Sequence, residues 1–284
     1  MITWIASYLK SGNTWFRVLL EALTRTDESA VSINALQRMN GHAAGRSLFD
    51  EFCAVKASYL SRETVERLRP RVYEAAAQSD SGQRYLKVHD AWTLVAPSDP
   101  MFPPAATTGV VYLARNPLDV AVSLRFHLSM DQDTAIRFMA NPHASISAGT
   151  HKLPEQLPQR LLRWSEHVSS WLESSLPVHL VRYEDLQSHP VETLQAVAAF
   201  LKIPTDDCRL RSAIETAAFD RLQAQESMYG FRERNRSAGA FFRRGETGTW
   251  RDELAAVQVT KIVADHGPMM RRLRYLDAAN RPLC

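Results

Sequence analysis

Cysteine is scarce in this sequence of 284 residues, which holds only Cys53, Cys208 and Cys284. Their odd number and wide spacing predict neither a disulfide framework nor a cysteine-based metal site, and both features favour a reducing compartment. Long hydrophobic runs are lacking as well, because the apolar run Ile2–Ala6 is too short for a signal peptide or a membrane span. We therefore expect a protein of the cytoplasm that does not insert into membranes.

An excess of charge of one sign is also missing. The chain has 34 lysines and arginines against 31 aspartates and glutamates, which gives a net charge of +3. This imbalance is too small to predict nucleic-acid binding, although a local basic patch for a small polyanion is compatible with it. The apolar fraction of 45% is typical of a globular protein. The length suits one large α/β domain or two small ones, and we expect a single domain that spans residues 1–284.

Short apolar runs alternate with helical patterns along the chain. Four runs rich in β-branched and aromatic residues are typical of buried strands: Ile2–Ala6, Tyr85–Val88, Val110–Ala114 and Val178–Val181. Helices are expected from Ser61 to Ala76, near Leu118 to Phe126, from Leu157 to Leu172 and from Val191 to Leu201, and loops at residues 38–49, 96–108 and 227–244. This alternation predicts an α/β fold with a mostly parallel sheet flanked by helices, and a ligand site at the carboxyl ends of the strands.

The segment Tyr8–Trp15 follows the first strand and precedes a helix expected at Phe16–Leu23. A strand, a short polar loop and a helix N-terminus together bind phosphate, because the first N–H groups of the helix carry a partial positive charge. Gly12 allows an anion to approach the backbone, Lys10 adds a full charge, and Thr14 is expected to cap the helix. The sequence lacks Gly-Lys-Ser and Gly-Lys-Thr, so this is not the usual nucleoside-triphosphate loop. An ordinary strand-to-helix turn is the alternative.

Arginines occur at two places in the sequence that are suited to binding an anion. Arg115 follows the third strand, and Ser123 falls two turns inside the next helix. A guanidinium fork and a hydroxyl both suit phosphate oxygens, although an ion pair between Arg115 and Asp119 is an alternative. Nearer the C-terminus, Arg243-Arg244-Gly245 places two cations beside a glycine. A solvated loop is the alternative there.

Lys87 and His89 close the second strand. Because residues two apart in a strand point to the same face, both side chains are expected at the ligand edge of the sheet. Histidine is the usual general base near neutral pH, so His89 is a candidate for that role. A structural or merely exposed histidine is the alternative.

Five motifs in one order along the chain make the sequence similar to the cytosolic type of sulfotransferase, including its bacterial members. These enzymes depend on PAPS, 3′-phosphoadenosine 5′-phosphosulfate. Tyr8–Trp15 resembles the family's 5′-phosphosulfate loop, and Arg115–Ser123 resembles its 3′-phosphate motif. Trp164–Trp171 resembles a structural helix, Arg182–Leu186 a Tyr-Glu-Asp turn, and Arg243–Trp250 the C-terminal glycine motif. The resemblance implies sulfuryl transfer from PAPS to a hydroxyl or amine of a small-molecule acceptor.

The resemblance also implies roles for single residues. Lys10 would hold the bridging oxygen as the sulfuryl group leaves, His89 would take the acceptor proton, and Lys87 would steady the transferring group. Ser123 completes this catalytic set. The residues implied in binding PAPS, or the product 3′-phosphoadenosine 5′-phosphate (PAP), are Lys10, Ser11, Gly12, Asn13, Thr14, Trp15, Arg115, Ser123, Tyr183, Phe219, Arg243, Arg244 and Gly245. No metal is expected, because the sequence shows no acidic cluster near the loop.

Some positions depart from the family pattern. Leu9 stands where a proline is usual, Ala217 and Ala218 where Thr-Ser is common, and Thr249 where an aspartate is usual. The first change could loosen the loop, and the alanines remove one expected hydrogen bond to adenine. The usual dimer motif is not matched at residues 251–260, so the oligomeric state is left open.

Two other functions compete with the sulfotransferase interpretation. One is a nucleotide or nucleoside kinase-like phosphotransferase that uses the same loop, against which the missing Gly-Lys-Ser/Thr weighs. The other is a non-catalytic module that binds PAPS or PAP without turnover. The presence of both Lys10 and His89 weighs against that module.

Overall fold

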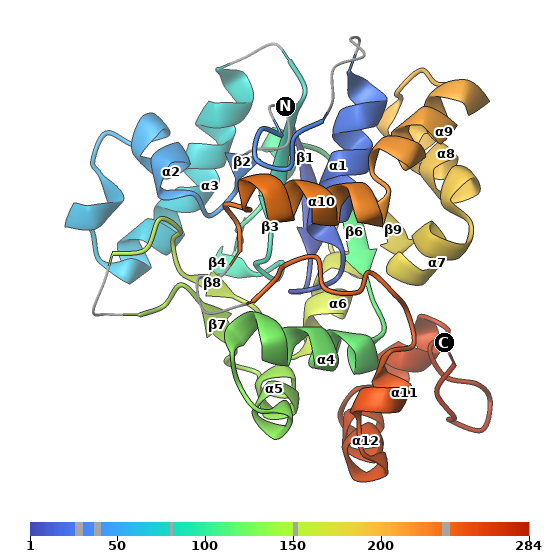
Figure 1. Ribbon diagram of the computed structural model, residues 1–284. Helices are drawn as coiled ribbons and strands as arrows, with labels where there is room; N and C mark the ends of the chain where they lie inside the picture. Colours follow the sequence, from blue (N-terminus) through green and yellow to red (C-terminus); the bar gives the residue numbers. More distant parts are fainter. Residues whose placement is uncertain (26–30, 37–40, 80–81, 150–152, 235–238, 284) are drawn as a thin grey trace. The chain divides into compact units, whose positions relative to one another are not determined.

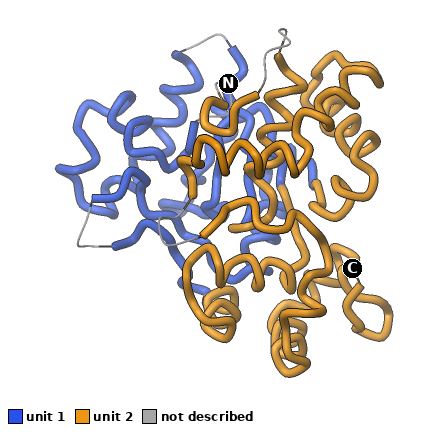
Figure 2. The backbone as a smooth tube through the Cα atoms, viewed as in Figure 1, with its two compact units in different colours: residues 1–8, 38–112, 142–180 blue, residues 9–37, 113–141, 181–284 orange. Residues whose placement is uncertain are grey.

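The computed structural model describes the chain except residues 26–30, 37–40, 80–81, 150–152, 235–238 and 284 (Figure 1). The chain divides into two compact units, shown in different colours in Figure 2. Unit 1 comprises Met1–Tyr8, Arg38–Tyr112 and Pro142–Leu180, and unit 2 comprises Leu9–Gln37, Leu113–Asn141 and Val181–Cys284. The single domain expected from the chain length stays a prediction.

A five-stranded sheet has the order β2-β3-β1-β6-β9, and most of its residues belong to unit 1. The strands are β1 Ile2–Ser7, β2 Gly41–His42, β3 Arg84–Val88, β6 Thr107–Ala114 and β9 Val178–Arg182. The pairs β1–β3 and β2–β3 are parallel, with Ala6 opposite Val88 at the carboxyl end of the first pair. Every residue of β1 is buried. The expected α/β class, with a mostly parallel sheet flanked by helices, is confirmed (Figure 1).

All four expected strands are present, and the sequence missed β2. That strand has only two residues and lies in a segment expected to be a loop, of which residues 38–40 fall outside the described part. Two small antiparallel pairs, β4 Leu94–Ala96 with β5 Asp99–Pro100 and β7 Ser145–Ile146 with β8 Gln159–Arg160, were also not expected. Strands this short carry no alternation that a sequence pattern could reveal.

The helices of unit 1 are α2 Arg46–Phe52, α3 Arg62–Gln78 and α6 Trp164–Leu172, with short 3₁₀ turns at Ala57–Tyr59 and Pro104–Ala106. Ser61 caps α3 as expected, because its Oγ accepts the backbone N–H of Thr64 at 3.1 Å. The helix expected from Leu157 to Leu172 begins only at Trp164, because Gln159 and Arg160 instead form strand β8.

Aromatic side chains form the centre of unit 1. The Trp4 ring lies 5.0 Å, centroid to centroid, from the rings of both Tyr73 and Phe102, and Phe102 lies 4.8 Å from Trp171. All four side chains are buried. Such pairs contribute about 0.5–1.5 kcal/mol each beyond the burial of their apolar area. Because Trp4 belongs to β1, this cluster packs on the strand that leads into the segment Tyr8–Trp15.

Unit 2 is mostly helical. Its helices are α1 Asn13–Thr24, α4 Pro117–Leu128, α5 Gln132–Met139, α7 Tyr183–Ser188, α8 Pro190–Leu201, α9 Asp207–Thr216, α10 Phe219–Tyr229, α11 Trp250–Glu253 and α12 Ala256–Arg272. Asn116 caps α4 through its side-chain oxygen, and Pro117 takes the first helical position, where its missing N–H removes no helical hydrogen bond. Helix α10 enters the segment expected to be a loop, and residues 235–238 of that segment lie outside the described part. Within the described residues, no helix is both long and apolar enough to span a membrane.

Candidate active site

The loop after β1 begins unit 2 and leads into helix α1. Gly12, not Thr14, is the N-cap, and it adopts φ 88° in the left-handed region. A Cβ atom at this position would lie 2.5 Å from Cδ2 of the Tyr183 ring, so both the backbone conformation and the space require glycine. Thr14 sits in the first turn, where its Oγ1 accepts a hydrogen bond from Arg17 at 3.3 Å. The capping role expected of Thr14 is therefore wrong.

Lys10 is held by both its backbone and its side chain. It adopts φ 63°, a left-handed conformation that costs a non-glycine residue roughly 1–2 kcal/mol. Its Nζ lies 4.0 Å from the centroid of the Phe241 ring, which is a cation–π contact. Its carbonyl oxygen accepts a hydrogen bond from Arg115 at 3.2 Å. These contacts tie the loop to two other segments of unit 2.

Arg115 links several expected site residues. Its Nη1 also lies 3.3 Å from Oγ of Ser123, and its Nη2 donates to the carbonyl oxygen of Glu246 at 2.8 Å. Its guanidinium carbon lies 4.4 Å from the centroid of the Tyr183 ring. Arg115 and Ser123 are thus neighbours, as the motif predicts. The guanidinium is oriented by main-chain carbonyls and an aromatic face rather than by a carboxylate.

Asp119 is fully buried and does not pair with Arg115, so that alternative is wrong. Its carboxylate accepts hydrogen bonds from the backbone N–H of Gly248 at 2.8 Å and of Trp250 at 3.1 Å. It also accepts one from the hydroxyl of Thr249 at 3.0 Å. Asp119 therefore fixes the segment that follows the paired arginines. The threonine that departs from the family pattern supplies one of the three donors.

An aromatic group surrounds the glycine after the paired arginines. Gly245 adopts φ 69°, and a Cβ there would lie 2.2 Å from the Phe219 ring. Its carbonyl oxygen accepts the Tyr183 hydroxyl at 2.9 Å, and burial raises the pKa of Tyr183, so this hydroxyl stays protonated. The Trp15 ring lies 5.3 Å from Tyr183, and its Nε1 donates to the carbonyl oxygen of Ala217 at 2.9 Å. The structure thus brings these expected residues together in unit 2.

The paired arginines meet a carboxylate that the sequence analysis missed. Oε1 of Glu253 lies 3.4 Å from Nη1 of Arg243 and 3.4 Å from Nη1 of Arg244. The Arg243 guanidinium also lies 4.1 Å from the centroid of the Phe126 ring. Phe126 is three residues after Ser123 on α4, so the two side chains share a face of that helix. Arg243 therefore lies about one turn along α4 from the Arg115–Ser123 pair.

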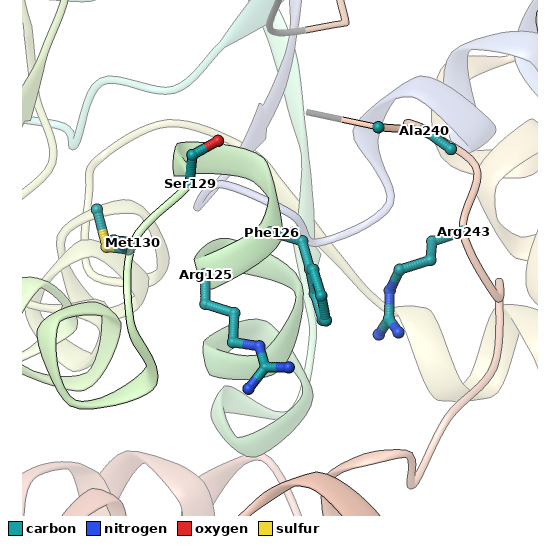
Figure 3. A pocket seen from close by; sticks show the side chains of 7 residues that line it. Arg125, Phe126, Ser129, Met130, Ala240 and Arg243 are labelled. Atoms are coloured by element: carbon teal, nitrogen blue, oxygen red, sulfur yellow. The ribbon is translucent and has the colours of Figure 1, made fainter. Parts of the chain in front are cut away.

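A cavity of about 380 Å³ lies beside this contact in unit 2 (Figure 3). Figure 3 shows the Phe126 ring between the side chains of Arg125 and Arg243. Ser129 and Met130 line the cavity from the end of α4. The cavity is therefore lined by the two guanidiniums of Arg125 and Arg243 and by the apolar ring that lies between them.

In unit 1, His89 follows directly after β3 and is buried. Its Nδ1 lies 2.9 Å from the carbonyl oxygen of Ser7, and because a carbonyl only accepts, Nδ1 carries the proton and Nε2 the lone pair. Burial lowers the pKa of His89 well below its usual range, and the positive charge of Lys87 and the neighbouring His42 lower it further. His89 is therefore a neutral imidazole near pH 7, the form that can accept a proton.

A second layer of polar groups holds the backbone at His89. The His89 carbonyl oxygen accepts Nε2–H of His167 at 3.1 Å, and Nδ1 of His167 accepts the Tyr112 hydroxyl at 2.8 Å. Burial lowers the pKa of His167 to about 4, which keeps this ring neutral too. The next residue, Asp90, forms a buried ion pair with Arg69, with Oδ2 at 2.6 Å from Nη2. The expected structural helix thus supports the carboxyl end of β3.

Buried donors in unit 2 match an anionic ligand. Ser11 is 2% exposed, and its Oγ has no hydrogen-bond partner among the described residues; the same holds for Nε of Arg115. No side chain of the described part caps α1, so its first N–H groups face the loop around Gly12. A hydroxyl, a guanidinium and a helix N-terminus are the donors that bind phosphate. The residues present therefore fit a phosphate group.

The expected site residues fall into two groups. Lys87 and His89 belong to unit 1. The other expected residues belong to unit 2: Lys10, Ser11, Gly12, Asn13, Thr14, Trp15, Arg115, Ser123, Tyr183, Phe219, Arg243, Arg244 and Gly245. In the described part of the chain, no group of three or more His, Cys, Asp or Glu is placed to hold a metal ion. A metal-free reaction stays a prediction.

Comparisons of sequence point to one family. The family described as Sulfotransferase domain matches residues 2–273. Rat (Rattus norvegicus) Sulfotransferase 2B1 is 28% identical over 167 residues, which are 52% of this chain and 44% of that protein. Cytosolic sulfotransferase 8 of Arabidopsis thaliana is 24% identical over 268 residues, which are 91% of this chain and 73% of that protein. The match thus spans less than half of the rat relative.

Solved structures share the fold. Mouse sulfotransferase SULT7A1 complexed with PAP superimposes with a TM-score of 0.60 at 16% identity, over 95% of this chain and 84% of that chain. Retinol dehydratase in a complex with retinol and PAP gives a TM-score of 0.63 at 18% identity, over 95% and 81% of the two chains. At these identities the similarity concerns the fold.

Proposed function

Because the chain belongs to the Sulfotransferase domain family, which matches residues 2–273, we propose that it moves a sulfuryl group from PAPS to a small-molecule hydroxyl or amine. The observation that carries the proposal is the Arg115 guanidinium, which contacts the carbonyl of Lys10 and the hydroxyl of Ser123. The contact joins the segment Tyr8–Trp15 to the motif Arg115–Ser123, through two residues that lie 105 positions apart in the chain. The solved mouse sulfotransferase SULT7A1 is a complex with PAP, and we extend that ligand to this chain.

The proposed nucleotide contacts follow the two arginine groups. The 3′-phosphate binds Arg115 together with Ser123 of α4, and it binds the paired arginines one turn further along that helix, since Arg243 stacks on Phe126 of the same face. The 5′-phosphate binds the N-terminus of α1 through Ser11, Gly12, Asn13 and Thr14. The adenine lies near Trp15 and Phe219, with Tyr183 hydrogen-bonded to the nucleotide. The close packing of the Tyr183 ring on Gly12 supports this grouping.

PAPS supplies the activated sulfuryl group, and the chain supplies positioning and charge. His89 takes the acceptor proton at Nε2 while the acceptor oxygen bonds to sulfur. The bond from sulfur to the bridging oxygen breaks, and its electron pair stays with the departing PAP. The neutral state and fixed tautomer of His89 support this assignment. A general base of this kind contributes about 10²–10⁴-fold to the rate.

Two lysines complete the proposed chemistry. Lys10 stabilises the negative charge that develops on the bridging oxygen, and Lys87 steadies the sulfuryl oxygens. Fixed cations at developing charge lower the barrier because they need no reorganisation during the reaction. The contact of Nζ of Lys10 with the Phe241 ring supports its role, because the ring orients the ammonium without neutralising it. A location in the cytoplasm and a bacterial source stay predictions.

The direct test is an assay of group transfer with purified protein. PAPS is incubated with a panel of phenols, sugars, lipids and amines, and mass spectrometry detects sulfated products together with PAP. The proposal expects equal amounts of product and PAP, and loss of both in Lys10→Ala. Phosphate transfer from ATP and Mg²⁺ instead would support the kinase-like alternative. Tight PAP binding with no sulfated product across the panel would support the non-catalytic binding module.

A further inference from the structure

Glu253 lies among three arginines of unit 2. Its Oε1 lies 3.4 Å from Arg243 and 3.4 Å from Arg244, and its Oε2 lies 3.3 Å from Nη2 of Arg125 on α4. The Glu253 side chain is 15% exposed, which limits screening by water. One carboxylate therefore faces three guanidiniums, and the cluster keeps an excess of positive charge.

The arginines do not depend on Glu253 alone for their orientation. Arg125 lies 4.3 Å and Arg243 4.1 Å from the centroid of the Phe126 ring, on which both guanidiniums stack. Figure 3 shows this ring between the two side chains. The ion pairs with Glu253 are long, at 3.3–3.4 Å, whereas optimal charge-assisted hydrogen bonds are about 2.7–2.9 Å. Removal of the carboxylate should leave the arginine stack in place.

We propose that Glu253 is a built-in competitor of the nucleotide 3′-phosphate, which weakens PAP binding and speeds the release of PAP. The inference rests on the proposed function, which assigns Arg243 and Arg244 to the 3′-phosphate. When a phosphate dianion binds these arginines, it shares their N–H donors with a carboxylate already in contact with them. The carboxylate also repels the dianion directly. Both effects lower the affinity for a nucleotide that carries the 3′-phosphate.

The electrostatic surroundings of Arg243 favour the binding of a further anion. Burial lowers the pKa of Arg243, and the positive charge of Arg244 lowers it again, while Glu253 acts in the opposite direction. A single carboxylate thus leaves the pair of cations undercompensated. An incoming dianion relieves their repulsion, and it gains more from doing so once Glu253 is neutral.

The test compares Glu253→Gln with the wild-type chain by calorimetry. Titration with PAP should show affinity about three- to tenfold tighter in the variant, together with a slower dissociation of PAP in stopped-flow displacement. Titration with AMP, which lacks the 3′-phosphate, should show no change. Asp252→Asn is the matched control, because Asp252 is exposed on the same short helix and the substitution removes the same charge. It should leave the affinity for PAP unchanged.

A second variant tests whether the effect passes through the arginines. In an Arg243→Ala background, Glu253→Gln should give a smaller gain, because one of its partners is missing. If Glu253→Gln does not fold, Glu253→Asp keeps the charge but shortens its reach, and it should give a smaller gain in the same direction. Unchanged or weaker PAP binding in these variants overturns the inference, as does an equal gain in Asp252→Asn or for AMP. If the wild-type chain binds PAP no better than AMP, the nucleotide assignment of the proposed function fails instead.

Discussion

Nδ1 of His89 lies 2.9 Å from the main-chain carbonyl oxygen of Ser7, so the backbone at the end of β1 holds the imidazole in one tautomer. The carbonyl oxygen of His89 is in turn held by His167 at 3.1 Å. Ser7 belongs to strand β1 and His167 to helix α6, so both neighbours lie in regular secondary structure. The lone pair at Nε2 of His89 is therefore set by the fold before any ligand binds.

His89→Asn tests the role of this lone pair. Asparagine can retain a hydrogen bond to the Ser7 carbonyl but cannot accept a proton near neutral pH. We expect kcat to fall by about 10²–10⁴-fold while the affinity for PAP changes little. Steady-state kinetics and calorimetry measure the two quantities. The exposed His143 provides the control variant His143→Asn, which should match the wild type. Retention of more than about a tenth of the turnover in His89→Asn would exclude a general base of this size.

The pH profile of kcat/KM should reflect the depressed pKa of His89. Burial and the charge of Lys87 both disfavour the protonated ring, so the neutral base persists well below pH 6.5. Activity should therefore stay level from pH 7.5 down to about 6.5 and fall only at more acidic values. Lys87→Gln removes one cause of the shift and should move this acidic limb to higher pH, whatever it does to the maximal rate. An acidic limb centred near 6.5 in the wild type would contradict the assignment.

Arg115→Lys tests the guanidinium fork of the proposed nucleotide site. Lysine keeps the charge but cannot reach Lys10, Ser123 and Glu246 at once, as Arg115 does. Loss of one or two charge-assisted bonds should weaken PAP binding by about 10- to 100-fold, with a much smaller effect on AMP. Arg211→Lys is the matched control, since Arg211 is 69% exposed on α9. Equal losses for PAP and AMP would remove Arg115 from the 3′-phosphate site.

Gly245→Ala tests the close packing of the glycine motif against Phe219. Gly230 offers a matched control, because it has the same φ of 69° but open space around a built Cβ. Both variants should pay the backbone cost of about 1 kcal/mol or more in stability, and only Gly245→Ala should also displace the Phe219 ring. We expect Gly245→Ala to weaken PAP binding at least fivefold more than Gly230→Ala, as measured by calorimetry. Identical binding in the two variants would show that the Phe219 contact does not serve the nucleotide.

Much of the fold could be predicted because it is encoded locally. The four long strands are runs of β-branched and aromatic residues. Helix α4 begins with residues typical of a helix start, a capping Asn116 and Pro117 at the first position. The helix expected at residues 157–172 was too long for a physical reason. Leu157, Leu161 and Trp164 are all buried with near-helical spacing, yet the residues between the first two pair with β7. Apolar periodicity reports burial, and tertiary pairing can produce the same pattern without a helix.

The site was predictable only where a motif carried it. The Arg115–Ser123 contact follows from the short spacing between the end of β6 and helix α4, and the loop around Gly12 follows from its residue types. Asp119 and Glu253 had no such signal. The hydrogen bond of Asp119 to Thr249 joins residues 130 positions apart. The ion pair of Glu253 with Arg125 likewise forms only because the fold brings α11 beside α4. Contacts of this kind depend on the tertiary fold, which the local sequence does not report.

The position of Trp15 gives the molecule an optical reporter of its own. Three of the six tryptophans, Trp4, Trp164 and Trp171, are fully buried in unit 1, away from bulk solvent. Trp15 is partly exposed beside Tyr183, and its indole N–H is engaged by Ala217. A change in its fluorescence would follow the state of the loop around Gly12 without a foreign dye. Comparison with Trp15→Phe would identify that signal. Fluorescence titration could then rank ligands by affinity before any acceptor is known.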